Sequence, residues 1–202
     1  ANTLISTSDI VMNHKEKKEL VRDYINPDLC EISEDLVYTE PFNDMNNRNN
    51  VFPPIKDFVE KELYSDEKLH LEVAKLKFDF MNNAQSLIHG DLHTGSVFIN
   101  KEHMYIFDPE FAFYGPMGYD IGNVIANMFF AWCHADAVLA DADERKEPFK
   151  TWVITQIKDL VDLFIEKYNK IYDEKVNDEM AKVPGFKEYY LSTILADTAV
   201  VA

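Results

Sequence analysis

The nine residues 88–96, IHGDLHTGS, bring two histidines, an aspartate and two hydroxyl side chains into one glycine-flanked stretch. The segment FDPEF at 107–111 adds two carboxylates, Asp108 and Glu110, on either side of one proline. A carboxylate in a short loop can align a hydroxyl nucleophile and accept its proton. Two carboxylates on a neighbouring segment can hold Mg²⁺ against nucleotide phosphates. The two stretches together therefore favour phosphoryl transfer.

A second interpretation of the same residues is a metal-dependent hydrolase. His103 and Asp108 could join the histidines of HGDLH as ligands of one ion. A hydrolase would keep Zn²⁺ or Mn²⁺ tightly bound through purification, whereas a phosphotransferase would bind Mg²⁺ weakly until nucleotide is added. The DPE segment alone is typical of a capped turn, and only the upstream loop makes metal binding the better interpretation.

The elements that must position these groups are short strands followed by a helix. SLIHG leads into the loop as an apolar strand, and residues 96–108 read as a β-hairpin that turns at KEH. Beyond GPMG, apolar residues recur at helical spacing from Ile121 to Trp132, which predicts a core-packed helix with Asp120 as its N-cap.

The rest of the chain predicts a mostly helical α+β fold. We expect helices over 14–27, stopped by Pro27, and over 55–84, broken near Ser65. Others are expected over about 148–172, with its apolar face in the core, and from Phe186 toward the end. The Asn- and Pro-rich residues 41–54 predict a mobile loop.

Glycine placement singles out the same region. Five of the six glycines lie between 90 and 122: Gly90, Gly95, Gly115, Gly118 and Gly122. Glycine is needed where the backbone turns tightly or comes close to a ligand. Their concentration therefore predicts loops shaped around a functional site.

Composition limits the kinds of partner. A chain of 202 residues with a net charge of −16 lacks the basic surface that nucleic acid or an anionic membrane requires. No apolar run is long enough to span a membrane, and no signal peptide is evident. Cys30 and Cys133 have no metal-ligand or disulfide spacing, so we expect reduced core thiols in a cytoplasmic protein.

HGDLHTGSVF followed by DPEFAFYGPMGYDIG resembles the catalytic loop and metal motif of the protein-kinase-like small-molecule phosphotransferases. Within that superfamily the sequence is most similar to the methylthioribose kinase family. The resemblance implies the C-terminal lobe of a kinase-like fold, with ATP as co-substrate and Mg²⁺ as cofactor. It also implies phosphorylation of 5-methylthioribose to its 1-phosphate in methionine salvage, by a homodimer that binds neither nucleic acid nor membrane.

The resemblance assigns a role to each motif residue. Asp91 would be the catalytic aspartate, and Asp108 and Glu110 would bind Mg²⁺. Two residues would support the loop: His89 and Asp120, the latter also open to simple N-capping. Two residues would lie near substrate or phosphate: His93, equally open to loop support, and Ser96, which stands where the superfamily has a metal-binding Asn.

The chain also departs from the family pattern. It has no G-x-G-x-x-G loop, no Lys–Glu nucleotide clamp, and no adjacent arginines, its three being Arg22, Arg48 and Arg145. We therefore expect residues 1–202 to be one lobe, without the N-terminal lobe and the extreme C-terminal segment, and inactive in isolation. The alternatives are another small-molecule kinase, of the aminoglycoside or choline kinase type, and a non-catalytic remnant that binds a partner.

Overall fold

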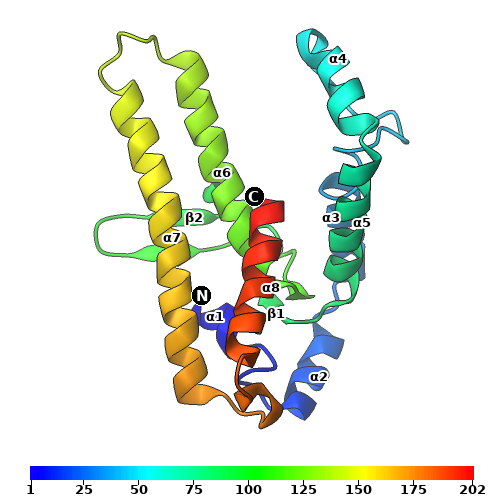
Figure 1. Ribbon diagram of the computed structural model, residues 1–202, viewed down its shortest axis with the longest axis vertical. Helices are drawn as coiled ribbons and strands as arrows, with labels where there is room; N and C mark the ends of the chain where they lie inside the picture. Colours follow the sequence, from blue (N-terminus) through cyan, green and yellow to red (C-terminus); the bar gives the residue numbers. More distant parts are fainter. The chain divides into compact units, whose positions relative to one another are not determined.

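The computed structural model describes residues 1–202, which divide into two compact units (Figure 1). Residues 1–24 and 84–202 form the larger unit, and residues 25–83 form the smaller unit. Helices dominate both, and the strands are few and short. The predicted α+β, mostly helical fold class is thus confirmed.

The larger unit carries two antiparallel two-stranded sheets. The hairpin predicted over 96–108 is confirmed as β2 (Val97–Ile99) and β3 (Met104–Ile106). The strand SLIHG is β1 (Ser86–Ile88), and it pairs with a strand that the sequence did not predict, β4 (Phe113–Gly115). Because Ile88 lies opposite Phe113, this pairing brings the loop after β1 beside the segment before β4.

Five α-helices and two short 3₁₀ turns complete the larger unit. They are α1 (Asn2–Ser6), α2 (His14–Asp23), η3 (Thr94–Ser96), α6 (Met117–Val138), α7 (Lys146–Lys175), η4 (Met180–Lys182) and α8 (Phe186–Val201). The two long helices α6 and α7 lie side by side, and α8 packs against the N-terminal part of α6 (Figure 1). The predicted helices over 148–172 and from Phe186 are confirmed.

Two of the five concentrated glycines serve helix packing rather than loop shape. A Cβ on Gly118 would lie 2.8 Å from the Ile194 carbonyl oxygen, and one on Gly122 would lie 2.9 Å from that of Thr198. Both distances are too short for a real contact, so α8 approaches α6 closely only because these positions have no side chain. The prediction that the glycines shape functional loops is wrong for these two.

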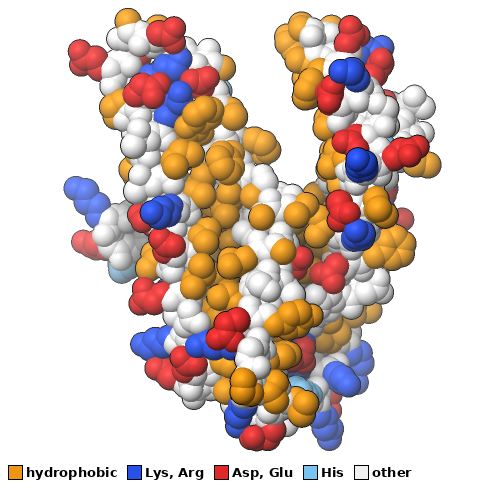
Figure 2. All heavy atoms as spheres, viewed as in Figure 1, with side chains coloured by type: hydrophobic (Ala, Val, Ile, Leu, Met, Phe, Trp, Pro, Cys, Tyr) orange, Lys and Arg blue, Asp and Glu red, His pale blue; other side chains and the backbone are white.

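The large apolar side chains of α6 are buried at its N-terminal end, and towards its C-terminal end only the small Ala135 is buried. Ile121 and Ile125 are buried, whereas Phe129 is 38% exposed. On α7, Val153 is buried but Trp152 is 53% exposed, and apolar side chains line the surface along these helices (Figure 2). The expectation of core packing along the whole apolar face of each helix is therefore wrong for Phe129 in the C-terminal half of α6 and for Trp152 near the start of α7.

The smaller unit is built from helices alone. They are α3 (Pro27–Leu36), η1 (Pro53–Ile55), α4 (Lys56–Val59), the π-helical turn η2 (Glu60–Tyr64) and α5 (Glu67–Asn82). The break near Ser65 is confirmed, and Asp66 caps α5 by accepting from Lys68 N and Leu69 N, both at 3.0 Å. The stop at Pro27 is wrong: α2 ends at Asp23, and Pro27 opens α3, where its missing N–H costs nothing.

Neither cysteine forms a disulfide. Cys133 is exposed, so the expectation of a core thiol is wrong there, while burial raises the pKa of the half-buried Cys30 thiol to about 11. None of the helices combines the length and the apolar character needed to cross a bilayer.

Candidate active site

Asp120 is the buried anchor of the site. It is 2% exposed and lies in the first turn of α6, which begins at Met117, so it does not cap that helix as predicted. Its carboxylate accepts hydrogen bonds from His89 N at 2.7 Å and Gly90 N at 3.0 Å. Burial raises the pKa of Asp120, and the two N–H donors partly oppose that rise. Asp120 thus holds the start of the HGD loop against α6.

Gly90 brings the HGD loop into contact with the DPEF segment. Its φ is +82°, and a Cβ there would lie only 2.1 Å from the carbonyl oxygen of Phe111. An L side chain would meet both a left-handed backbone and a backbone collision. The close approach explains why a glycine stands between His89 and Asp91.

His89 makes a second link between the two segments. Its Nε2 lies 2.9 Å from the carbonyl oxygen of Phe107, the residue that precedes Asp108. The N–H of Phe107 in turn donates to the carbonyl oxygen of Ser96 at 3.1 Å. The residues that resemblance assigns to catalysis and to the metal are therefore held in one hydrogen-bonded cluster. We call residues 89–96 and 107–111, with Asp120, the loop cluster.

Asp91 lies at the accessible side of the loop cluster. Its side chain is 49% exposed, and its carboxylate lies 3.5 Å from His93 Nε2. The ring of His93 also accepts from Gly95 N at 3.0 Å and lies 3.2 Å from the Ser96 hydroxyl. Ser96 is 3% exposed and turned into the loop. The Asp91 carboxylate is therefore accessible to a substrate hydroxyl, whereas His93 and Ser96 make hydrogen bonds within the loop.

Asp108 and Glu110 lie on the exposed segment that follows the β2–β3 hairpin. Asp108 has a φ of +65°, an uncommon backbone state for a residue other than glycine, and it precedes Pro109. Aspartate and asparagine adopt this state more readily than most residues, and Asn26 and Asn47 do so elsewhere in the chain. Here the pairing of the hairpin and the His89–Phe107 bond fix the chain on the N-terminal side of Asp108.

The oxygen ligands of Asp108 and Glu110 suit one of the two metal interpretations better than the other. Carboxylate oxygens suit Mg²⁺, which keeps several waters and binds through one or two carboxylates together with substrate phosphates. No group of three or more His, Cys, Asp or Glu side chains comes together as a cage for an ion. His103 lies exposed in the turn between β2 and β3. Asp108 and Glu110 could hold Mg²⁺ together with substrate phosphates, and the arrangement does not support the hydrolase with His and carboxylate ligands.

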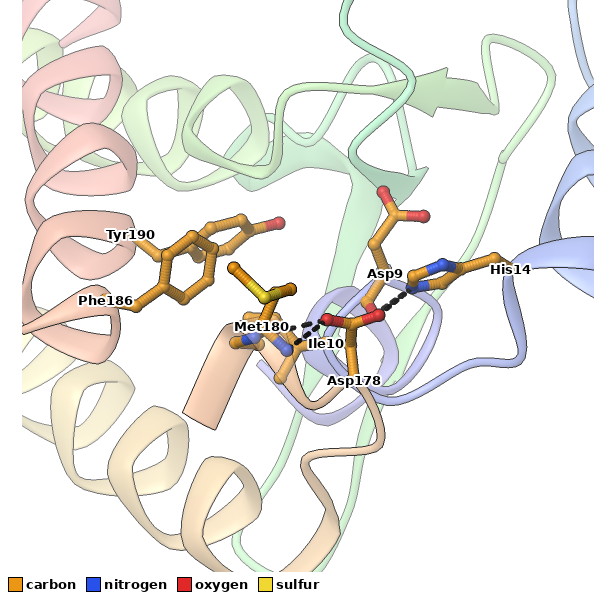
Figure 3. Close-up of a pocket in the computed structure, with 8 residues that line it drawn as sticks. Asp9, Ile10, His14, Asp178, Met180, Phe186 and Tyr190 are labelled. Carbon is orange, nitrogen blue, oxygen red and sulfur yellow. Dashed lines mark hydrogen bonds and ion pairs between the residues drawn. The ribbon is translucent and has the colours of Figure 1, made fainter. Parts of the chain in front are cut away.

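A pocket of about 320 Å³ lies elsewhere in the larger unit, between the segment joining α1 to α2, η4 and α8 (Figure 3). Apolar and aromatic side chains form most of its wall, with acidic and histidine groups at one side: Asp9, Ile10, His14, Asp178, Met180, Ala181, Phe186 and Tyr190. Asp178 accepts from Met180 N at 2.7 Å, and its carboxylate lies 3.8 Å from His14. No residue of the loop cluster lines this pocket.

Sequence reasoning missed the partners that hold the site. The contacts at Phe107 and Phe111 involve backbone groups, which every residue type has, so the sequence could not have predicted them. The His93 contact with Gly95 did leave one, a glycine two residues after a histidine.

The sequence profile of APH, described as the phosphotransferase enzyme family, matches residues 44–152, just over half of the chain. The chain is 41% identical over 202 residues to the methylthioribose kinase of Geobacillus sp. (strain WCH70), covering 98% of this chain and 46% of the relative. It is 39% identical over 197 residues to the methylthioribose kinase of Geobacillus kaustophilus (strain HTA426), covering 98% of this chain and 47% of the relative. The chain is 36% identical over 199 residues to the methylthioribose kinase of Enterobacter sp. (strain 638), covering 98% of this chain and 48% of the relative.

The chain thus spans about half the length of the curated relatives it matches. The profile match includes the whole of the loop cluster, from His89 to Asp120. The chain belongs to the phosphotransferase enzyme family, APH.

Proposed function

We propose that this chain is the catalytic and substrate-binding lobe of an ATP-dependent kinase that phosphorylates 5-methylthioribose to its 1-phosphate. The observation that carries the proposal is the juxtaposition of the Asp91 loop and the Asp108–Glu110 segment through Gly90, His89 and the β1–β4 pairing. Family membership supports the reaction class, and the names of the relatives support the substrate.

Asp91 is the group that acts on the acceptor. A sugar hydroxyl is a weak nucleophile until it is aligned with the γ-phosphate and its proton has an acceptor. The half-exposed carboxylate of Asp91 can align that hydroxyl and accept the proton. Asp120 and His89 act on the loop rather than on the substrate, because the hydrogen bonds that define their places go to backbone groups.

Asp108 and Glu110 are the residues that would hold Mg²⁺. When bound, the ion neutralises charge on the nucleotide phosphates. This role suits a chain with a net charge of −16, in which carboxylates far outnumber the cationic side chains that could bind phosphate directly. The exposed carboxylates of Asp108 and Glu110 present oxygen ligands on one short segment.

The experiment is an acceptor panel with the full-length gene product that contains this chain. ADP release is measured with ATP and Mg²⁺ and with methylthioribose, choline or an aminoglycoside in turn, and ³¹P NMR identifies the phosphorylated position. We expect transfer to methylthioribose at the 1-position. Transfer to choline or an aminoglycoside alone would favour another small-molecule kinase, and no transfer to any acceptor would favour a non-catalytic remnant.

Two expectations rest on the resemblance alone and stay predictions: a homodimer and a cytoplasmic location. Light scattering of the full-length gene product tests the first, and fractionation of cells that express it tests the second. We also expect the 202-residue chain alone to show little or no transfer, because it contains neither a glycine-rich phosphate loop nor adjacent arginines.

A further inference from the structure

We propose that His93 is a positioning residue whose Nε2–H orients the carboxylate of Asp91, and that it does not contact substrate. The observations are three contacts of one imidazole ring, to Gly95, Ser96 and Asp91. The inference rests on the proposed function only in taking Asp91 as the catalytic carboxylate.

The contact with Gly95 determines which ring nitrogen carries the proton. Gly95 N–H donates to His93 Nδ1 at 3.0 Å, so Nδ1 is an acceptor. A neutral imidazole has one N–H group, and it must therefore be at Nε2. The backbone of the loop thus turns the donor side of the ring toward Ser96 and Asp91.

The Nε2–H has one partner at hydrogen-bond distance, Ser96, and a longer contact with the charged carboxylate of Asp91. Ser96 Oγ lies 3.2 Å from Nε2, and the nearer carboxylate oxygen of Asp91 lies 3.5 Å from it. The Ser96 hydroxyl donates to the backbone carbonyl of Asp91 at 3.4 Å, which leaves its oxygen free to accept from His93. The hydrogen bonds of this set reach the backbone carbonyl of Asp91, and the ring nitrogen lies 3.5 Å from its carboxylate.

The space around Gly95 shows how closely the ring lies on the loop backbone. A Cβ at this position would lie 2.7 Å from His93 Cε1 and 2.8 Å from Nδ1. Unlike Gly90, Gly95 has no positive φ that would require glycine. The ring of His93, whose side chain is 44% exposed, therefore packs directly on the backbone of Gly95, and any side chain at position 95 would displace it.

Both ring nitrogens of His93 are thus used inside the loop. A residue that contacts the substrate would leave one nitrogen facing outward, whereas a positioning residue acts through Asp91. Loss of the Nε2–H should free the Asp91 carboxylate to rotate. The rate of transfer should then fall without a matching loss of substrate binding.

Two substitutions separate the two nitrogens. In His93→Gln the amide nitrogen can reach the place of Nε2 and donate to Asp91, whereas in His93→Asn the amide can replace only the Nδ1 contact with Gly95. In the full-length gene product we expect Asn to lower kcat about 10- to 100-fold with both KM values within a few-fold, and Gln to retain kcat within about threefold. Melting temperatures of both variants show whether they are folded.

Three outcomes would overturn the proposal. A raised KM with unchanged kcat in both variants would make His93 a substrate contact. Equal losses of kcat in Gln and Asn, with lowered melting temperatures, would make it a structural brace. A fully active Asn variant would remove His93 from the site.

A second measurement does not depend on the proposed function. In the 202-residue chain, ¹⁵N NMR follows the His93 ring in the wild type, in Asp91→Asn and in Ser96→Ala, with the exposed His103 as the control. We expect both substitutions to shift the His93 Nε2 resonance and to leave that of His103 in place. An unmoved Nε2 resonance would overturn the proposal even if the protein is an active kinase. A shifted one would support the contact even if the acceptor panel showed no transfer.

Discussion

The loop cluster and the pocket between α2, η4 and α8 are held in different ways. In the loop cluster, side chains bind backbone groups: Asp120 holds two N–H groups, and His89 holds the carbonyl of Phe107. In the pocket, side chains such as Phe186 and Tyr190 form the wall (Figure 3). Side chains that must hydrogen-bond particular backbone groups can be of few residue types and must lie at fixed spacings. Many apolar residues, in contrast, can form the wall of a pocket. Only the first leaves a pattern in the sequence.

Gly90→Ala should have the largest effect on stability. The left-handed backbone and the collision with the Phe111 carbonyl together should cost about 3 kcal/mol or more in the free energy of unfolding, measured by urea denaturation of the chain. Gly185→Ala is the matched control, because Gly185 has a φ of +87° but no atom within 4 Å of an added Cβ. That variant should lose only about 1–2 kcal/mol. Equal losses would mean that the loop does not contact Phe111.

Asp120→Asn should have the next largest effect. An amide offers one oxygen to the two N–H donors, so one hydrogen bond is lost or weakened and the variant should lose about 2 kcal/mol in the free energy of unfolding. The control is Asp159→Asn on the exposed side of α7, which should change stability by about 0.5 kcal/mol or less.

The pH dependence of this difference has a definite sign. Because the pKa of Asp120 is raised in the folded state, its contribution to stability is largest below the unfolded pKa and decreases as pH rises through the folded pKa. The asparagine of the variant has no titrating group, so its stability lacks this pH dependence. The gap in stability between wild type and Asp120→Asn should therefore narrow as pH rises from about 4. A gap that widens would mean that the two N–H donors outweigh burial.

Glu110→Ala tests the metal side of the loop cluster in the full-length gene product. Loss of one of two carboxylate ligands should raise the Mg²⁺ concentration for half-maximal rate about tenfold and change the KM for sugar by less. Glu102→Ala, in the exposed turn between β2 and β3, is the matched control. An unchanged Mg²⁺ titration would remove Glu110 from the site.

Ile10→Val tests whether an apolar substitution in the pocket wall has only a small effect on stability. Ile10 is 2% exposed, and removal of one methylene should cost about 0.5–1.5 kcal/mol in stability. Because the pocket shares no lining residue with the loop cluster, the NMR signals of the His89 and His93 rings should not move. Movement of those signals would show that the two regions are coupled.

The same contrast explains which parts of the fold could be predicted. The hairpin of β2 and β3, the break before α5 and the start of α8 depend on local turn and capping residues, and each was found. Strand β4 was missed because its partner β1 lies far along the chain, and three apolar residues alone do not define a strand. Pro27 was misread because proline suits the first turn of a helix as well as it ends one.

At the candidate site, residue type and spacing identified the groups that could do chemistry. The structure adds how they are held, which the sequence could not show, since any residue can supply the carbonyls at positions 107 and 111. Only the N-cap role predicted for Asp120 was wrong, for a related reason. An aspartate near a helix start is typical of an N-cap, and that part of the expectation is wrong, whereas the loop support that the resemblance implied agrees with the bonds from His89 N and Gly90 N.

The central claim is that Asp91 is the catalytic carboxylate, and Asp91→Asn in the full-length gene product tests it most directly. Asn retains the shape of the side chain but cannot accept the proton of the sugar hydroxyl. We expect kcat to fall about 10²- to 10⁴-fold, with both KM values within a few-fold and the melting temperature nearly unchanged. A variant that keeps kcat within about threefold of the wild type would contradict the claim.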